Sequence, residues 1–239
     1  MGSHTLPKSG LYIALAAVAV FFVMTAVASA QPSPTDVIYV GETGDFASIQ
    51  AAINNAADGD TIIVQSDYDP SNDASGITID KSITLMGEAP SVHIGPDNPS
   101  GYVIIDGEEI YYQIIITADD VTIKDLTIDF YMQDGEYTVS ILINGGLSGV
   151  ELNNLVIEPA DEYEYPTAFI MPLSPVTVDD VTLQADLEPL EEGPMSEPSP
   201  LSPAPPGVTA VWVPSTVSGV TFSGFTISGT WDFGFYIEG

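Results

Sequence analysis

Arginine and cysteine are absent from this chain of 239 residues, and lysine occurs only three times, as Lys8, Lys81 and Lys124. Without cysteine there are no disulfides, thiolate metal ligands or cysteine nucleophiles. Thirty-four acidic residues outweigh the lysines, so the formal net charge is −31 at pH 7. Binding to nucleic acid or to anionic lipid is excluded, because phosphate contacts need Lys or Arg side chains.

Apolar residues are plentiful despite this acidity. They make up 45% of the sequence, whereas acidic disordered tails are poor in apolar residues. The length allows one substantial domain or two small ones. We therefore expect a folded chain that buries a sizeable core.

The first thirty residues have the features of a secretory signal peptide. Residues 11–30 are apolar or small with three exceptions, and they end in Ala28-Ser29-Ala30, a small-x-small pattern that favours cleavage before Gln31. A run of this length is also able to cross a bilayer as an uncleaved anchor. In both cases we expect residues 31–239 to be extracellular or at the cell surface. Membrane contact is then expected only through an uncleaved N-terminal segment.

The sequence predicts one helix near the start of the mature chain, over about residues 46–57. Apolar residues recur there at three- and four-residue spacing, and Asp45 is a plausible N-cap. Gly59 stands where a helix C′ glycine is expected. One short strand-like run precedes the helix, at residues 37–40. After the helix the chain shows only such runs, at residues 61–64, 77–79, 83–87, 102–107 and 113–117.

A repeat dominates the rest of the chain. The octets are VTIKDLTI (121–128), VELNNLVI (150–157), VTVDDVTL (176–183) and VTFSGFTI (220–227), which begin 29, 26 and 44 residues apart. Each follows another strand-like run, at 113–117, 139–144, 167–172 and 209–214. A unit this short, with strands and turns only, leaves no room for a βαβ crossover and predicts one coil of a parallel β-solenoid.

Two further features fit this repeat. Asp125, Asn154, Asp180 and Gly224 occupy the same position of the four octets, which predicts a turn that favours left-handed backbone. The longest interval contains a Pro/Glu-rich stretch at about 187–206, which we expect to be a loop inserted into one late coil.

Residues 41–88 resemble the N-terminal cap and first coils of the pectin lyase-like, right-handed parallel β-helix superfamily. The matching positions are Gly44, Asp45, Phe46, Ile49, Gln50, Ala52 and Ile53, then Gly59-Asp60-Thr61-Ile62 and Val64, and finally Ile79, Lys81, Ile83, Thr84, Leu85 and Gly87. The resemblance implies an all-β, right-handed parallel β-helix over residues 31–239, capped by the short N-terminal helix. It does not set the activity, because this superfamily includes esterases, lyases, hydrolases, adhesins and non-catalytic surface proteins.

The enzymes of the superfamily use residues that this chain lacks. Its lyases and esterases typically rely on an Arg, and its polygalacturonase-like hydrolases on Asp residues near a His-Gly pair, whereas His93 here precedes Ile94. The pairs Asp119-Asp120 and Asp179-Asp180 are interpreted as turn residues of an acidic protein. Lys124 is expected to form an ion pair with a nearby Asp rather than to act as a base, because carboxylates raise a lysine pKa.

Two binding sites remain as hypotheses. Acidic loops of the early coils provide oxygen ligands for a calcium site, with Asp58, Asp60, Asp67 and Asp69 as candidates. The alternative is a solvated acidic surface. Aromatic residues gather in the middle coils, among them Tyr102, Tyr111 and Tyr112, with Tyr131, Tyr137, Tyr163 and Tyr165 as the candidate glycan-binding set. Stacking ladders between coils are the structural alternative.

The functional hypothesis is a non-catalytic, secreted or cell-surface protein of the envelope that binds glycans or neighbouring surface proteins. A polysaccharide lyase or hydrolase acting on acidic glycans and a self-assembling structural surface protein are the alternatives. The chain stops in a strand-like run, FGFYIEG (233–239). Unpaired strand edges associate readily, so we expect either a truncated member of a longer family or end-to-end self-association.

Overall fold

The computed structural model describes most of the chain after residue 34. The described residues are 35–73, 75–95, 101–105, 108–130, 137–159, 168–185, 209–213, 217–229 and 233–237. Residues 34–239 form one compact unit. The expected signal peptide or anchor (1–30) and the expected inserted loop (187–206) lie outside the described residues. In the part that is described, no helix has the length and apolarity needed to cross a membrane.

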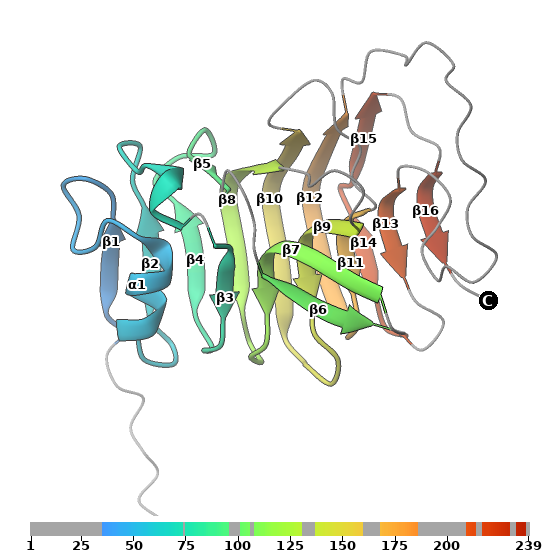
Figure 1. Ribbon diagram of the computed structural model, residues 1–239, viewed down its shortest axis with the longest axis horizontal. Coiled ribbons are helices and arrows are strands. Elements are labelled where there is room, and N and C mark those ends of the chain that lie inside the picture. Colours follow the sequence, from blue (N-terminus) through green and yellow to red (C-terminus); the bar gives the residue numbers. More distant parts are fainter. Residues whose placement is uncertain are drawn as a thin grey trace, which may run out of the picture. The chain divides into compact units, whose positions relative to one another are not determined.

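The fold is mostly β, with two sheets whose strands are almost all parallel (Figure 1). The first sheet has the order β1-β2-β4-β8-β10-β12-β14, with β5 also paired to β8 and β15 to β12. Its strands are β1 Val37–Val40, β2 Thr61–Val64, β4 Thr84–Gly87, β5 His93–Ile94, β8 Thr122–Phe130, β10 Val150–Pro159, β12 Val176–Ala185, β14 Thr221–Ser223 and β15 Thr226–Gly229.

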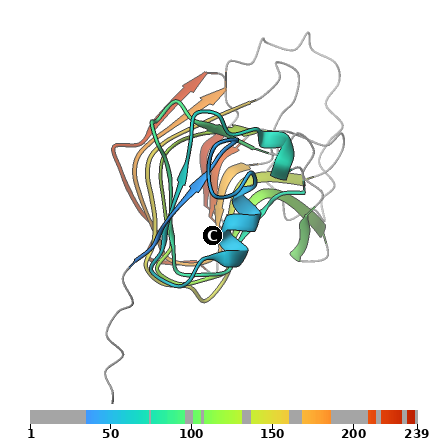
Figure 2. The same ribbon diagram turned by 90° about the vertical axis from the view of Figure 1, so that its left-hand side faces the viewer.

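The second sheet has the order β16-β13-β11-β9-β7-β3, with β6 added to β7. Its strands are β3 Ile77–Ile79, β6 Tyr102–Ile105, β7 Glu108–Ile116, β9 Tyr137–Ile143, β11 Ala168–Pro172, β13 Thr209–Val213 and β16 Phe233–Ile237. From β7 onward the chain passes alternately between the two sheets, as the repeat predicts, except that β14 and β15 follow one another in the first sheet. Figure 2 shows the molecule along the direction in which the strands are stacked, with helix α1 in the foreground.

The octets stack in register, which brings equivalent apolar residues together. Leu152 of β10 pairs with Ile123 of β8 and Val178 of β12, and all three are fully buried. Isoleucines of the second sheet, such as Ile114 and Ile141, belong to the same apolar cluster. The core therefore lies between the two sheets, and the alternation of side chains along each strand turns the intervening residues to the opposite face.

The predicted left-handed position is confirmed. Asp125, Asn154 and Asp180 have φ angles of 55°, 48° and 52°, and Gly224 has 59°. The amide of Asn154 also donates to Asp125 Oδ1 at 2.7 Å, so the side chains join neighbouring strands. Short polar side chains tolerate this backbone better than branched apolar ones, which explains their presence in the middle of long strands.

Helix α1 is shorter than predicted, spanning Ile49–Asn55. Its N-cap is Ser48, whose hydroxyl accepts from the backbone N–H of Ala51, so the assignment of Asp45 was wrong. The Asp45 carboxylate instead accepts from the backbone N–H of Tyr39 in β1. The C-cap is Ala56, and Gly59 lies beyond it in a turn with φ 94° rather than at C′.

Helix α1 covers the end of the stack where β1 and β3 are the edge strands. Ile49, Ala52 and Ile53 are fully buried in the shared core. The side-chain amide of Gln50 accepts from the Thr78 backbone N–H at 2.7 Å and donates to the Thr78 carbonyl at 3.2 Å. Gln50 thereby satisfies the backbone groups that a further strand beside β3 would otherwise pair with, and so protects the edge of the second sheet.

Candidate functional site

The four aspartates proposed for calcium lie at the two ends of β2. Asp58 accepts from the backbone N–H of Ser82, and the buried Asp60 accepts from the N–H groups of Asp36 and Ala57. Both precede β2 and tie its turn to the segments before β1 and β4. Carboxylates used in this way stabilise turns, because they satisfy backbone donors that would otherwise lack partners.

Asp67 and Asp69 follow β2. One oxygen of Asp67 accepts from both the backbone N–H and the hydroxyl of Thr43, and Asp69 accepts from the N–H of Ser71. The hydrogen bonds from Ser71 lower the pKa of Asp69 below its usual value. The strand between the two pairs keeps them apart, and among the described residues no group of three metal-ligating side chains includes any of the four.

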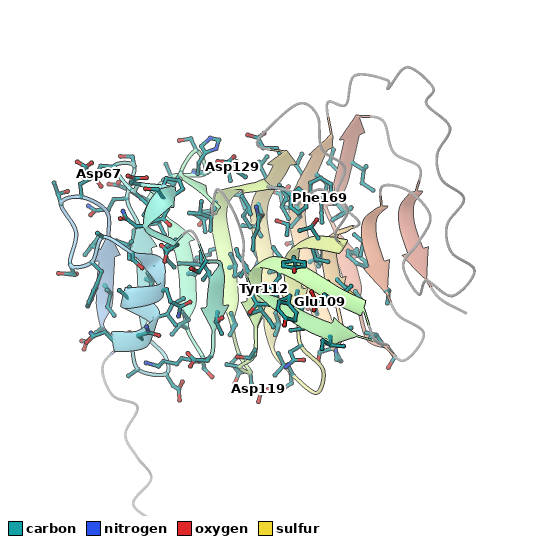
Figure 3. The ribbon with its side chains drawn as sticks, viewed as in Figure 1. Asp67, Glu109, Tyr112, Asp119, Asp129 and Phe169 are labelled. Atoms are coloured by element: carbon teal, nitrogen blue, oxygen red, sulfur yellow. The ribbon has the colours of Figure 1, made fainter. Side chains whose placement is uncertain are left out.

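The predicted tyrosine set cannot be placed in a site. Tyr131, Tyr163 and Tyr165 lie outside the described residues, and Tyr137 is described only as the first residue of β9. The aspartate pairs act between coils. Asp119 accepts from the N–H and hydroxyl of Ser148, as expected for a turn residue, and Figure 3 shows it at the opposite end of the strands from Asp129.

The second aspartate pair makes a similar contact. Asp179 Oδ1 accepts from the Ser223 hydroxyl at 2.7 Å, which links β12 to β14. The ion pair expected for Lys124 was wrong, since within the described residues Lys124 lies in no ion pair with an aspartate. It occupies a row of the first sheet between Met86 of β4 and Asn153 of β10.

The described residues contain one group suited to holding a metal ion, formed by His93, Asp129 and Glu158. His93 Nδ1 lies 2.8 Å from Asp129 Oδ1 and 4.0 Å from Glu158 Oε1. The His93 side chain is 49% exposed, against 23% for Asp129 and 31% for Glu158. We call these three residues the histidine cluster; the label on Asp129 marks its position in Figure 3.

The register of three strands builds the histidine cluster. Asp129 of β8 and Glu158 of β10 are direct partners, and His93 of β5 is the partner of Thr127, two residues before Asp129. The next residue after His93, Ile94, is fully buried. Neighbouring side chains along a strand point to opposite faces, so the imidazole is directed outward, beside the carboxylates.

A glycine lets β5 approach β8 this closely. Gly95 follows β5, and a Cβ added to it would lie 2.2 Å from the carbonyl oxygen of Asp129. Two hydrogen bonds hold the same segment, from the Thr127 N–H to the Val92 carbonyl and from the Thr127 hydroxyl to the Pro90 carbonyl. The position of His93 is therefore fixed by the contacts that the residues before and after it in the sequence make with β8.

A second feature is the hairpin of β6 and β7, the one antiparallel pair among the described strands. On one of its faces, Val103, Ile110 and Tyr112 join an apolar cluster with residues of β9 and β11, which follow β7 in the same sheet. Figure 3 labels Tyr112 and Glu109 on β7. The inner face thus accounts for how the hairpin is held.

The outer face of the hairpin carries Tyr102, Ile104, Glu109 and Tyr111, which we call the hairpin patch. Tyr102 pairs with Tyr111 and Ile104 with Glu109 across the two strands. The Tyr102 and Tyr111 ring centroids are 5.5 Å apart, and the Tyr111 hydroxyl donates to Glu109 Oε2 at 3.1 Å. Tyr102 is 47% exposed and Ile104 67% exposed, so apolar surface remains open to solvent.

Sequence signals existed for parts of both features. Ile105 pairs with Glu108, and the residues between them in the sequence are Asp-Gly, the dipeptide typical of two-residue hairpin turns. Asp129 and Glu158 each follow their octet directly, so the repeat alone makes them neighbours. No comparable signal identifies His93, because a strand of two residues is too short to show periodicity.

No protein-family model, no curated protein and no solved structure matches this chain. Its function has to be argued from the described surface and its chemistry.

Proposed function

We propose that this chain is a secreted or cell-surface right-handed parallel β-helix that works without catalysis and binds glycans through the hairpin patch. The hairpin patch carries the proposal, because it exposes aromatic and acidic side chains together. Sugar rings have apolar C–H faces and hydroxyl rims, and a tyrosine ring beside a carboxylate complements both.

The β-helix part of the proposal has support from the strand order. Successive octets pair in parallel and in register, and the chain returns to the second sheet between them. The left-handed residue recurs at the same point of each strand. Stacked coils with one turn position in common are what a parallel β-helix requires.

The glycan part of the proposal depends on exposed side chains that the packing of the fold does not explain. The inner face of the hairpin already packs Val103 and Ile110 into an apolar cluster, so packing gives no reason for exposed Tyr102 and Ile104 on the outer face. A tyrosine offers a large apolar ring with a polar tip and loses little conformational entropy on binding. Glu109 uses one oxygen for Tyr111 and belongs to the same face, where it can accept from sugar hydroxyls.

The location has support from the sequence alone. Residues 11–30 have the length and apolarity of a secretory segment. The net charge of −31 suits a surface exposed to solvent and salt. A glycan of the cell envelope is then the partner that such a protein meets.

Binding to immobilised neutral, amino-sugar and uronic-acid polysaccharides tests the proposal. For any glycan that binds, we expect Tyr102→Ala and Glu109→Gln to weaken the affinity at least tenfold. Tyr39→Ala is the matched control, because Tyr39 is 44% exposed but lies in β1 of the other sheet. Equal effects of Tyr102→Ala and Tyr39→Ala, or no binding across the panel, would contradict a glycan site on the hairpin.

The same incubations test the absence of catalysis. Unsaturated products or new reducing ends in the supernatant would show that the protein is a lyase or hydrolase instead. If no glycan binds but a surface protein co-purifies with the chain, and Tyr102→Ala abolishes this co-purification, the hairpin patch binds a protein instead of a glycan.

A further inference from the structure

We propose that His93, Asp129 and Glu158 form a surface site for a divalent transition metal, with Zn²⁺ as the preferred ion. The site is separate from the hairpin patch and does not depend on its function. Each residue offers one ligand atom, and the three atoms lie within 4.8 Å of one another. The ligands come from β5, β8 and β10, which are adjacent in the first sheet.

The distances suit a zinc ion after small side-chain movements. With metal–ligand bonds of about 2.0–2.2 Å, tetrahedral ligand atoms are separated by roughly 3.3 Å. The distances from His93 Nδ1 are 2.8 Å to Asp129 and 4.0 Å to Glu158. Each therefore has to change by less than about 1 Å, a movement open to partly exposed side chains.

The donor set favours zinc over calcium. An imidazole nitrogen with carboxylate oxygens is a ligand combination of Zn²⁺ and similar ions, whereas Ca²⁺ takes six to eight oxygens. Three protein ligands leave a fourth tetrahedral position for water or for an external ligand. The partial exposure of all three side chains keeps that position accessible to solvent.

Charge gives an independent reason for a cation at this point. Asp129 and Glu158 are direct partners on neighbouring strands, and like charges in such positions destabilise a sheet. In the described part of the chain, His93 is the one basic side chain that lies within ion-pair distance of them. A divalent ion offsets both carboxylates, while the imidazole alone carries at most one charge.

Zinc titration of the full chain by calorimetry tests the proposal. An acidic protein attracts many divalent ions weakly, so the buffer contains about 0.15 M NaCl to screen exposed charges and millimolar Ca²⁺ to occupy oxygen-only sites. We expect one Zn²⁺ per chain, a higher melting temperature in its presence, and at least tenfold weaker binding in His93→Ala and Glu158→Gln.

Two control variants separate this site from general acidic attraction. Glu151→Gln removes the same charge from the start of the same strand, and His4→Ala removes the other histidine of the chain. Both are expected to bind zinc as the unchanged protein does. Unfolding of each variant without zinc confirms that the fold is intact, and substitution by Co²⁺ reports the coordination by its visible spectrum.

Equal losses in Glu151→Gln and Glu158→Gln, or undiminished binding in His93→Ala, would overturn the proposal and leave adventitious binding to the acidic surface only. Displacement of zinc by the millimolar Ca²⁺ would also overturn it. Failure of the glycan experiments has no bearing on these outcomes.

Discussion

Asp73 and Lys81, eight positions apart in the sequence, hold opposite ends of helix α1. Asp73 accepts from the backbone N–H groups of Ile49 and Gln50 at the N-terminus, and Lys81 Nζ donates to the carbonyls of Asn54 and Ala56 at the C-terminus. The negative group therefore meets the positive end of the helix dipole, and the positive group meets its negative end. A helix of seven residues is too short to be stable alone, so these contacts fix it on the stack.

Replacement of Asp73 is expected to destabilise the protein strongly. Its buried carboxylate also accepts from the hydroxyls of Ser48 and Tyr68, which makes four hydrogen bonds in all. An asparagine has one acceptor oxygen, so Asp73→Asn leaves buried donors unsatisfied. We expect a loss of about 3 kcal/mol or more in the free energy of unfolding, measured with urea.

The control for this prediction is Asp69→Asn, four residues earlier and directly before the short 3-10 helix Pro70–Asp73. Asp69 is exposed and its partner is the nearby Ser71. We expect no measurable change in the free energy of unfolding, as for most surface substitutions. Similar losses in both variants would show that the loop, rather than the cap that Asp73 provides, determines the stability.

Because of Tyr68, we expect the free energy of unfolding to fall at alkaline pH. Burial, followed by the charge of Asp73 and its hydrogen bond, raises the pKa of Tyr68 far above its usual value. In the unfolded chain the phenol ionises near pH 10, so the folded protein holds a proton that the unfolded chain releases. The contribution is fully present below about pH 10 and declines above it, by up to about 1.4 kcal/mol per pH unit.

Comparison with Tyr68→Phe isolates this effect from the other tyrosines. At pH 7 the variant is expected to be less stable by about 1.5–3 kcal/mol, because it lacks the hydrogen bond to a charged acceptor. Urea unfolding at intervals from pH 8 to about 11.5 should show this difference shrinking above pH 10. A difference that stays constant over this range would mean that Tyr68 ionises as easily in the folded protein as in the unfolded chain.

The sequence predicted the strands well because their packing repeats. The predicted runs at residues 61–64 and 77–79 coincide with β2 and β3, since both alternate buried and half-buried positions. The left-handed position was likewise visible, because four octets place Asp, Asn or Gly at the same point. Regular stacking of the strands leaves the same residue pattern in each repeat, so the pattern is visible in the sequence.

The N-cap of helix α1 and the histidine cluster, which the sequence did not predict, depend on individual contacts. Asp45 and Ser48 are both good N-cap residues, and only the bond from Tyr39 to Asp45 shows why Ser48 is the cap. The histidine cluster requires β5, whose two residues contact β8 across a sequence separation of more than thirty. Such long-range contacts occur once and leave no periodic trace.

The left-handed position makes a prediction about the repeat itself. Asp180 has φ 52°, and the next octet has Gly224 at the same point. A β-branched residue is strained in this conformation, so Asp180→Val should lower the free energy of unfolding by about 1–2 kcal/mol, whereas Asp180→Gly should change it little. Thr182→Val, two residues further along β12 in ordinary strand conformation, is the control and should be neutral or slightly stabilising. If Asp180→Val and Thr182→Val behave alike in urea unfolding, backbone strain does not select the residues at this position of the octets.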